Sequence, residues 1–280
     1  MTSAKPSATE VGTPEPKRLS RVGRIGAGLI LWLRDLLYEA GVVGRLTRIC
    51  LSLRAWPRTT RNVLARQVFF TGVGAVRFTL LIAFLVGISI VLQADLWLKQ
   101  AGQGELLGPV LVAVVVRELG PLLVNIVILV RSGSAIVTEL ATMTVGGEVR
   151  LLESQGVDPL EYLVLPRVLG VTVSVACLTV LFIIASLASG FVASLGLQSH
   201  GDVSFEFLDS VLSAVKRSDL FHVTAKTVLP ALLTSTICCI EGMGAGSART
   251  EIPRAATRAL SRAIGALFIS SATVSIFSYL

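Results

Sequence analysis

The feature that most constrains this chain is a series of long apolar segments, one of which has two adjacent charges near its middle. The segment from Leu106 to Val130 contains only two charged residues, Arg117 and Glu118. As an α-helix, its 25 residues would be about 37 Å long, enough to cross a bilayer with some tilt. The two charges would then lie near mid-membrane, where charge is costly and usually functional.

Five segments are long and apolar enough for membrane-spanning helices. Of the 280 residues, 53% are hydrophobic and 15% are charged, whereas about 25% of a soluble domain is charged. The sequence therefore predicts an all-α, polytopic membrane protein. We expect the spans at about 74–96, 106–133, 164–197, 221–245 and 260–280.

The region before the first span divides into two parts. Residues 1–24 are polar and lack the apolar stretch of a secretory signal, so we expect a disordered cytoplasmic tail. Residues 25–56 combine arginines with apolar residues at helical spacing. This pattern favours an amphipathic helix lying in the membrane interface. The alternative is a soluble helix packed on the domain.

The distribution of basic residues predicts the topology. If the N-terminus is cytoplasmic, the inner segments carry twelve arginines near the ends of the spans, and the outer loops carry only Lys99, Lys216 and Arg217. Basic residues are enriched on the cytoplasmic side of membrane proteins. We therefore expect a cytoplasmic N-terminus and a C-terminus on the outer side.

The segment between the second and third spans, 137–167, is too polar to cross a membrane. Residues 139–153 are predicted to form a short cytoplasmic helix, weakened in the middle by Gly146-Gly147. Asp158-Pro159 has the pattern of a helix N-cap followed by the first helical residue, and predicts the start of the third span. The short helix is suited to receive force from a soluble partner; the alternative is a connecting loop without a partner.

This part of the chain resembles the permease subunits of the MlaE (YrbE) family of lipid-transporting ABC systems. The resemblance is continuous in order and spacing over about 50 residues and weaker over most of 60–245. The matching motifs are Arg117-Glu118-Leu119-Gly120-Pro121, Arg131 with Gly133, Glu139-Leu140-Ala141-Thr142-Met143 with Val145, Gly156-Val157-Asp158-Pro159, Tyr162-Leu163-Val164 and Pro166-Arg167.

The resemblance implies a homodimeric permease domain over 25–280 that moves phospholipids or related lipids between the bacterial inner membrane and the cell envelope. It implies a cytoplasmic ABC ATPase as partner, which would hold the ATP and Mg²⁺ while this chain binds no cofactor, and a periplasmic ring of MCE-domain proteins. The predicted helix at 139–153 matches the coupling helix that docks on the ATPase. Its candidate coupling residues are Glu139, Leu140, Thr142, Met143, Val145, Glu148 and Arg150.

The intramembrane polar residues Arg117, Glu118, Asn125 and Lys226 are the candidates for a lipid pathway. Arg117 and Glu118 are adjacent, so they point about 100° apart on a helix, whereas Glu118 and Asn125 share a face. The charged pair either borders a lipid-holding cavity or is buried and bonded to other helices. Lys226 either attracts an anionic headgroup or extends to the interface, and the second interpretation is favoured.

The sequence argues against an enzyme. It has no phosphate-binding G-x-x-x-x-G-K-[ST] motif, so ATP hydrolysis is assigned to a partner chain. It contains no H-E-x-x-H motif or G-x-S-x-G elbow, and its four cysteines are suited to apolar packing rather than to a metal site. The alternative to an ABC permease is a self-contained channel or ion-coupled transporter, which should have more intramembrane charges than Arg117, Glu118 and Lys226.

Overall fold

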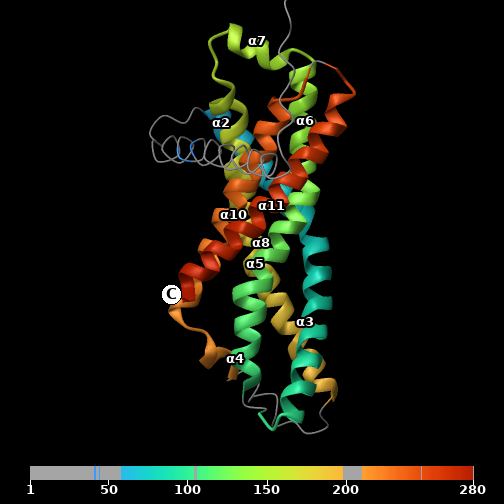
Figure 1. The fold of residues 1–280 in the computed structure, drawn as a ribbon, viewed down its shortest axis with the longest axis vertical. Helices are drawn as coiled ribbons and strands as arrows, with labels where there is room; N and C mark the ends of the chain where they lie inside the picture. The colour runs from blue at the N-terminus through green and yellow to red at the C-terminus, as the bar shows by residue number, and fades with distance from the viewer. Residues whose placement is uncertain are drawn as a thin grey trace, which may run out of the picture. The chain divides into compact units, whose positions relative to one another are not determined.

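The structure is a computed structural model that describes residues 41, 44, 58–103, 106–197, 210–246 and 248–279. The predicted tail at 1–24 and the predicted interfacial helix at 25–56, apart from Gly41 and Gly44, lie outside these residues. All regular elements of the described part are helices (Figure 1). The all-α fold class is therefore confirmed.

The described part contains five helical rods, and short π-helical segments, labelled η, occur in three of them. The first rod is α2 (Arg58–Val68), η2 (Phe69–Val73) and α3 (Gly74–Gln100). The second is α4 (Leu107–Leu111), η4 (Val112–Leu119), α5 (Gly120–Ile128), η5 (Leu129–Gly133) and α6 (Ser134–Val145). After α7 (Glu148–Ser154) come η6 (Leu160–Val164) and α8 (Leu165–Leu197), then α10 (Arg217–Met243) and α11 (Glu251–Tyr279).

These rods confirm the five predicted spans. Each contains a segment long and apolar enough to cross a membrane, at Asn62–Gln100, Leu107–Val145, Leu160–Leu195, Ser218–Met243 and Glu251–Ser278. The second rod is longer than predicted, since it continues without a break through Val145 rather than ending near residue 133. The coupling segment therefore begins as a direct extension of a span.

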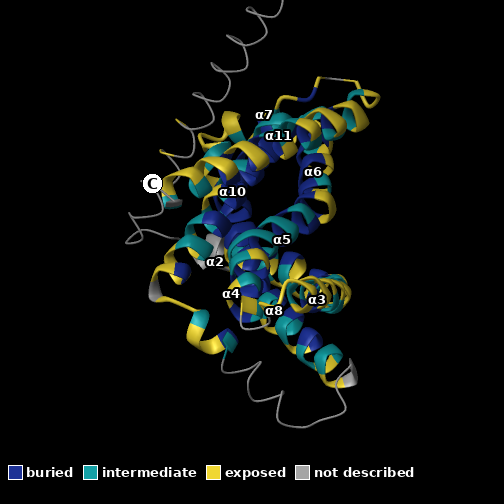
Figure 2. Ribbon diagram, turned by 60° about the horizontal axis from the view of Figure 1, so that its bottom comes forward, coloured by how far each residue is buried: buried dark blue, intermediate teal, exposed yellow. Residues whose placement is uncertain are grey.

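The helix α3 packs on α8 through a straight ridge of mostly small side chains. Its buried positions recur every fourth residue, at Ala75, Thr79, Ala83, Gly87 and Val91, which is the spacing of an i, i+4 ridge. A Cβ at Gly87 would overlap the backbone of α8, so this glycine permits the close approach. Large apolar side chains of α3, among them Phe84, Leu85 and Trp97, are exposed on its other sides, as expected for a helix that faces lipid (Figure 2).

The segment beyond the second span contains two helices where the sequence predicted one helix over 139–153. The first, α6, ends at Val145, and α7 begins at Glu148. Gly147 between them has φ 80°, in the left-handed region that favours glycine. The Gly146-Gly147 pair therefore makes a turn and does not merely weaken a helix, and Figure 1 shows α7 turning away from α6.

The predicted start of the third span is confirmed. The backbone N–H of Leu160 donates to Asp158 Oδ1 at 2.9 Å, and that of Tyr162 donates to the Asp158 carbonyl at 3.1 Å. Pro159 lies at the first helical position, where the backbone N–H has no partner within the helix, so proline loses no hydrogen bond there. The N-cap at Asp158 thus sets where the chain turns back towards the membrane.

Candidate functional site

The candidate site is a cluster of charged and polar side chains where η4 meets α10 and α11, here called the central polar cluster: Arg117, Glu118, Asp219, Lys226 and Ser275. Arg117 and Glu118 lie in η4, directly before Gly120 and Pro121. Pro121 has no N–H to donate to the carbonyl one turn earlier and would clash with it. A wide π-helical turn before the proline accommodates both constraints and is common at functional sites.

Arg117 forms an ion pair with Asp219 at the start of α10, with Nη2 and Oδ1 2.8 Å apart. The Asp219 side chain is only 3% exposed. Its other oxygen, Oδ2, accepts a hydrogen bond of 2.9 Å from the backbone N–H of Lys216 and so caps α10. One carboxylate therefore both begins α10 and attaches it to η4.

Glu118 and Lys226 form the second ion pair of the cluster. Lys226 Nζ donates to Glu118 Oε2 and to Ser275 Oγ on α11, and Ser275 Oγ donates to Glu118 Oε1 at 3.2 Å. The lysine side chain is 3% exposed, whereas that of Glu118 is 43% exposed. The favoured interpretation that Lys226 extends to the interface is therefore wrong: a carboxylate and a hydroxyl inside the bundle hold its ammonium group.

Asn125 lies in α5, directly after the π-helical segment that carries Glu118, and is buried. Its Nδ2 donates to the Pro121 carbonyl at 2.8 Å and to the Thr227 carbonyl at 3.4 Å. Asn125 therefore connects α5 to α10 next to Lys226. Of the four predicted intramembrane residues, Arg117, Glu118 and Lys226 belong to the central polar cluster, and Asn125 lies beside it.

A small cavity adjoins the cluster. Its volume is about 10 Å³, and Arg117, Glu118, His222, Lys226, Val274, Ser275 and Ser278 line it. A single water molecule needs at least about 10–15 Å³, so no lipid headgroup fits there. Within one chain, the geometry thus matches the alternative in which the charged residues are bonded to other helices. Only the exposed side of Glu118 and part of Arg117 open outward.

Sequence reasoning missed Asp219 and Ser275. Asp219 is the acidic residue in the first turn of a span, a position where a carboxylate stabilises a helix N-terminus, and this pattern could have identified it. Ser275 is one of several small residues in the last span, so no local signal separates it from its neighbours. Its role follows only from its hydrogen bonds to Lys226 and Glu118.

The coupling residues fall into two groups in the structure. Thr142, Glu148 and Arg150 are exposed, and Met143 and Val145 are half-buried. Leu140 is fully buried, so it has no surface for direct contact with a partner, and a part in coupling through its packing stays a prediction. Leu151 on α7, which sequence reasoning did not select, is 58% exposed and is the prominent apolar side chain there.

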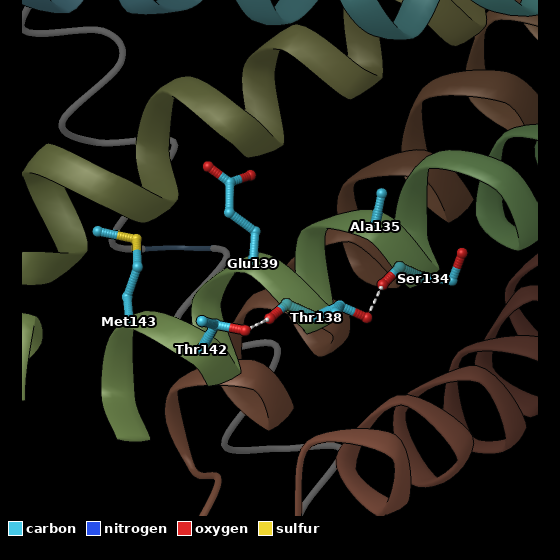
Figure 3. A pocket seen from close by; sticks show the side chains of 6 residues that line it. All are labelled: Ser134, Ala135, Thr138, Glu139, Thr142 and Met143. Atoms are coloured by element: carbon cyan, nitrogen blue, oxygen red, sulfur yellow. Dashed lines mark hydrogen bonds between the residues drawn. The ribbon is translucent and has the colours of Figure 1, made fainter. Parts of the chain in front are cut away.

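Glu139 pairs with Arg167 at the start of α8, with Arg167 Nη2 and Glu139 Oε1 2.8 Å apart. Arg167 is buried and also donates to the Leu163 carbonyl. Figure 3 shows Glu139 extending from α6 across a groove of about 560 Å³, which Ser134, Ala135, Thr138, Glu139, Thr142 and Met143 line. The pair connects the coupling end of the second rod to the third.

The described residues contain no group of three or more His, Cys, Asp or Glu side chains that could hold a metal ion. Cys238 and Cys239 are buried in α10, whereas Cys177 is exposed on α8. Exposure on an apolar span still suits a small apolar side chain, because lipid replaces protein as its neighbour.

The family model described as Permease MlaE matches residues 64–277, which include both the central polar cluster and the coupling segment. The chain belongs to the MlaE permease family. The resemblance noted in the sequence is thus confirmed. Since the match covers every described span, the five rods are those of an MlaE permease.

Two of three reported relatives of this MlaE permease are named as ABC transporter permeases. A probable ABC transporter permease protein of Rickettsia typhi is 25% identical over 222 residues, covering 79% of this chain and 85% of the relative. One from Synechocystis is 28% identical over 243 residues, covering 87% and 90%. The chloroplastic protein Trigalactosyldiacylglycerol 1 of Arabidopsis thaliana is 28% identical over 219 residues, covering 78% and 62%. The chain is therefore an ABC-type, multi-pass membrane permease, a class of protein that implies an ATPase partner.

Proposed function

We propose that this chain is the membrane subunit of an ABC transporter that moves phospholipids or related lipids between the bacterial inner membrane and the cell envelope. The match to Permease MlaE over 64–277 carries this proposal. The Arabidopsis relative supports a lipid cargo, since it is named after trigalactosyldiacylglycerol, a glycolipid. The twelve inner and three outer basic residues near the spans support a cytoplasmic N-terminus and a periplasmic C-terminus.

The lipid pathway is proposed to form between two copies of the chain. The cavity at the central polar cluster is about 10 Å³, far below the 300–1,000 Å³ of small-molecule pockets. The Glu118 side chain is nevertheless 43% exposed in one chain. Contact between a charged carboxylate and lipid tails has a high free-energy cost, so this side of Glu118 should not face the lipid. A second copy would shelter Glu118 and Arg117 and create a larger space that they border.

The ATPase is proposed to dock on α7 and the exposed end of α6. Leu151 offers an apolar anchor there, and the exposed charges of Glu148 and Arg150 lie beside it. Buried apolar anchors surrounded by polar residues are the usual arrangement of a protein interface. An MCE-domain ring is the proposed partner on the opposite, periplasmic side.

Force from the ATPase would reach the central polar cluster through one continuous rod. Because α6, η5, α5 and η4 follow each other without a break, a displacement at α7 tilts or shifts the segment that carries Arg117 and Glu118. The Glu139–Arg167 ion pair transmits the same displacement to α8. The partner supplies ATP hydrolysis, and the residues of this chain convert the displacement into movement of the helices around the lipid.

Reconstitution of the tagged full-length chain with the ATPase that co-purifies with it tests the proposal. We expect ATP-dependent transfer of a fluorescent phospholipid between proteoliposomes and acceptor vesicles. Arg117→Ala should abolish transfer while the ATPase still co-purifies, whereas Arg249→Ala, at an exposed turn outside the spans, serves as the matched control. Failure to recover an ATPase, together with ion flux through the chain alone, would instead establish a self-contained transporter.

A further inference from the structure

A second arginine site lies away from the central polar cluster, where η5 meets the start of α3. Arg131 in η5 rests its guanidinium group against Gly74 of α3. A Cβ at Gly74 would lie 2.5 Å from Arg131 Nη2 and 2.8 Å from Nη1. The absence of a side chain at Gly74 thus lets the guanidinium approach the backbone of α3, and any larger residue would displace it.

Arg77 supplies a second positive charge on the adjoining turn of α3. It lies three residues after Gly74, on nearly the same face of α3, and both arginines are exposed. Side chains on a helix lean towards its N-terminus and cover the preceding turn. This tendency favours an Arg77 side chain that extends over the turn containing Gly74, the residue that the Arg131 guanidinium contacts.

Neither arginine has a carboxylate partner among the described residues. By contrast, five other described arginines lie within 4 Å of a carboxylate oxygen: Arg117, Arg167, Arg254, Arg258 and Arg262. Like charges on neighbouring positions repel each other. Two exposed guanidinium groups on neighbouring elements without a carboxylate partner make a positively charged surface that attracts an external anion.

The surroundings of the arginine pair are those of a lipid-facing surface. Phe70, Val73 and Phe78 on the first rod and Val130 on the second are all exposed. An anion that reaches this site must therefore tolerate an apolar surface on every side. A phosphate attached to acyl chains has this property, and a free ion does not.

The depth of the pair also fits a headgroup. Arg77 lies 23 residues before Gln100, and Arg131 lies 24 residues after Leu107, which corresponds to about 35 and 36 Å along the two antiparallel helices. The hydrocarbon core of a bilayer is about 30 Å thick. If the connection at 101–106 lies at one membrane surface, both guanidinium groups lie in the headgroup layer of the other.

We propose that Arg77 and Arg131, positioned by Gly74, bind the phosphate of an anionic phospholipid on the outer surface of the helix bundle. Arginine forks bind phosphate oxygens in pairs, and the exposed Phe78 and Val130, on the hydrocarbon side of the two arginines, would contact the acyl chains. In the predicted topology this lipid lies in the cytoplasmic leaflet, which is rich in anionic lipids. The site requires neither the ATPase nor transport, so it stands independently of the proposed function.

Native mass spectrometry of the purified full-length chain, titrated with phosphatidylglycerol or with phosphatidylcholine of the same acyl chains, tests the proposal. We expect the wild-type chain to prefer phosphatidylglycerol. Arg77→Gln and Arg131→Gln should each weaken its binding about fivefold, the effect of one basic residue near an anionic surface. Gly74→Ala should weaken it as well, although both charges remain, because the new methyl group displaces the Arg131 guanidinium.

Two matched controls separate this site from general charge effects. Gly265→Ala adds a methyl group that meets no atom within 4 Å, and Arg249→Gln removes an exposed arginine from the turn before α11. Both should bind phosphatidylglycerol like the wild type. Equal binding by wild type and the Arg77→Gln/Arg131→Gln double variant would overturn the proposal. The proposal would also be overturned if millimolar inorganic phosphate displaced bound phosphatidylglycerol as effectively as added phosphatidylglycerol does. That result would instead indicate a site for a free anion.

Discussion

The Glu118–Lys226 ion pair should respond very differently to the loss of each partner. Lys226 is 3% exposed, and Glu118 is 43% exposed. Glu118→Ala leaves a buried ammonium group with only Ser275 as a partner, and an uncompensated buried charge costs about 3–5 kcal/mol. Lys226→Met leaves a carboxylate that borders the proposed space between the two copies and is not enclosed within one chain, so we expect a loss nearer to about 1 kcal/mol, the value for partly exposed pairs.

The double variant Glu118→Ala/Lys226→Met isolates the pair. Because neither charge remains, its free energy of unfolding should lie within about 1 kcal/mol of that of Lys226→Met, so the two substitutions are strongly non-additive. The measurement is reversible unfolding of the purified chain in mixed detergent micelles. A loss for Lys226→Met equal to or greater than that for Glu118→Ala would refute the reasoning from burial.

The same three variants separate a structural role from a transport role. If the ion pair only holds η4 against α10 and α11, the double variant should recover lipid transfer along with stability. We expect stability to recover and transfer to remain absent, because the proposed pathway needs the exposed carboxylate of Glu118 itself. Recovery of transfer by the double variant would assign the pair to assembly alone.

Substitutions at three further positions test the geometry. Asp219→Ala should destabilise the chain by about 1 kcal/mol more than Asp219→Asn. Asparagine can still cap α10, although it lacks the charge that faces Arg117, and comparison of the two unfolding curves checks this difference. Gly147→Ala places a side chain at φ 80° and should lower the free energy of unfolding by about 1–2 kcal/mol. It should also weaken ATPase co-purification, and a wild-type yield of ATPase would show that docking does not depend on this turn. Gly87→Ala should separate α3 from α8 and lower the thermal unfolding temperature, whereas Gly265→Ala, with open space around its Cβ, should leave this temperature unchanged.

Much of the coupling segment could be predicted locally. The N-cap at Asp158 depends on hydrogen bonds within four residues, so the sequence pattern was sufficient. The turn at Gly147 was only partly predicted, because two consecutive glycines indicate a weak point but not the sign of φ. Leu140 and Leu151 show the limit of the pattern: both are apolar residues of one short segment, yet packing buries the first and exposes the second.

The sequence by itself determined the five spans and the position of Arg117 and Glu118 inside one of them, because the thickness of a bilayer converts the length of an apolar run directly into structure. Only the tertiary structure decided which groups those charges meet. Lys226 lies 108 residues from Glu118, and Ser275 lies 157 residues from it. A span that is apolar on nearly all sides has no hydrophobic face to orient it, so close packing between small residues, as at Gly87, sets its rotation. That rotation brings Asp219 to Arg117 and leaves Arg131 against Gly74.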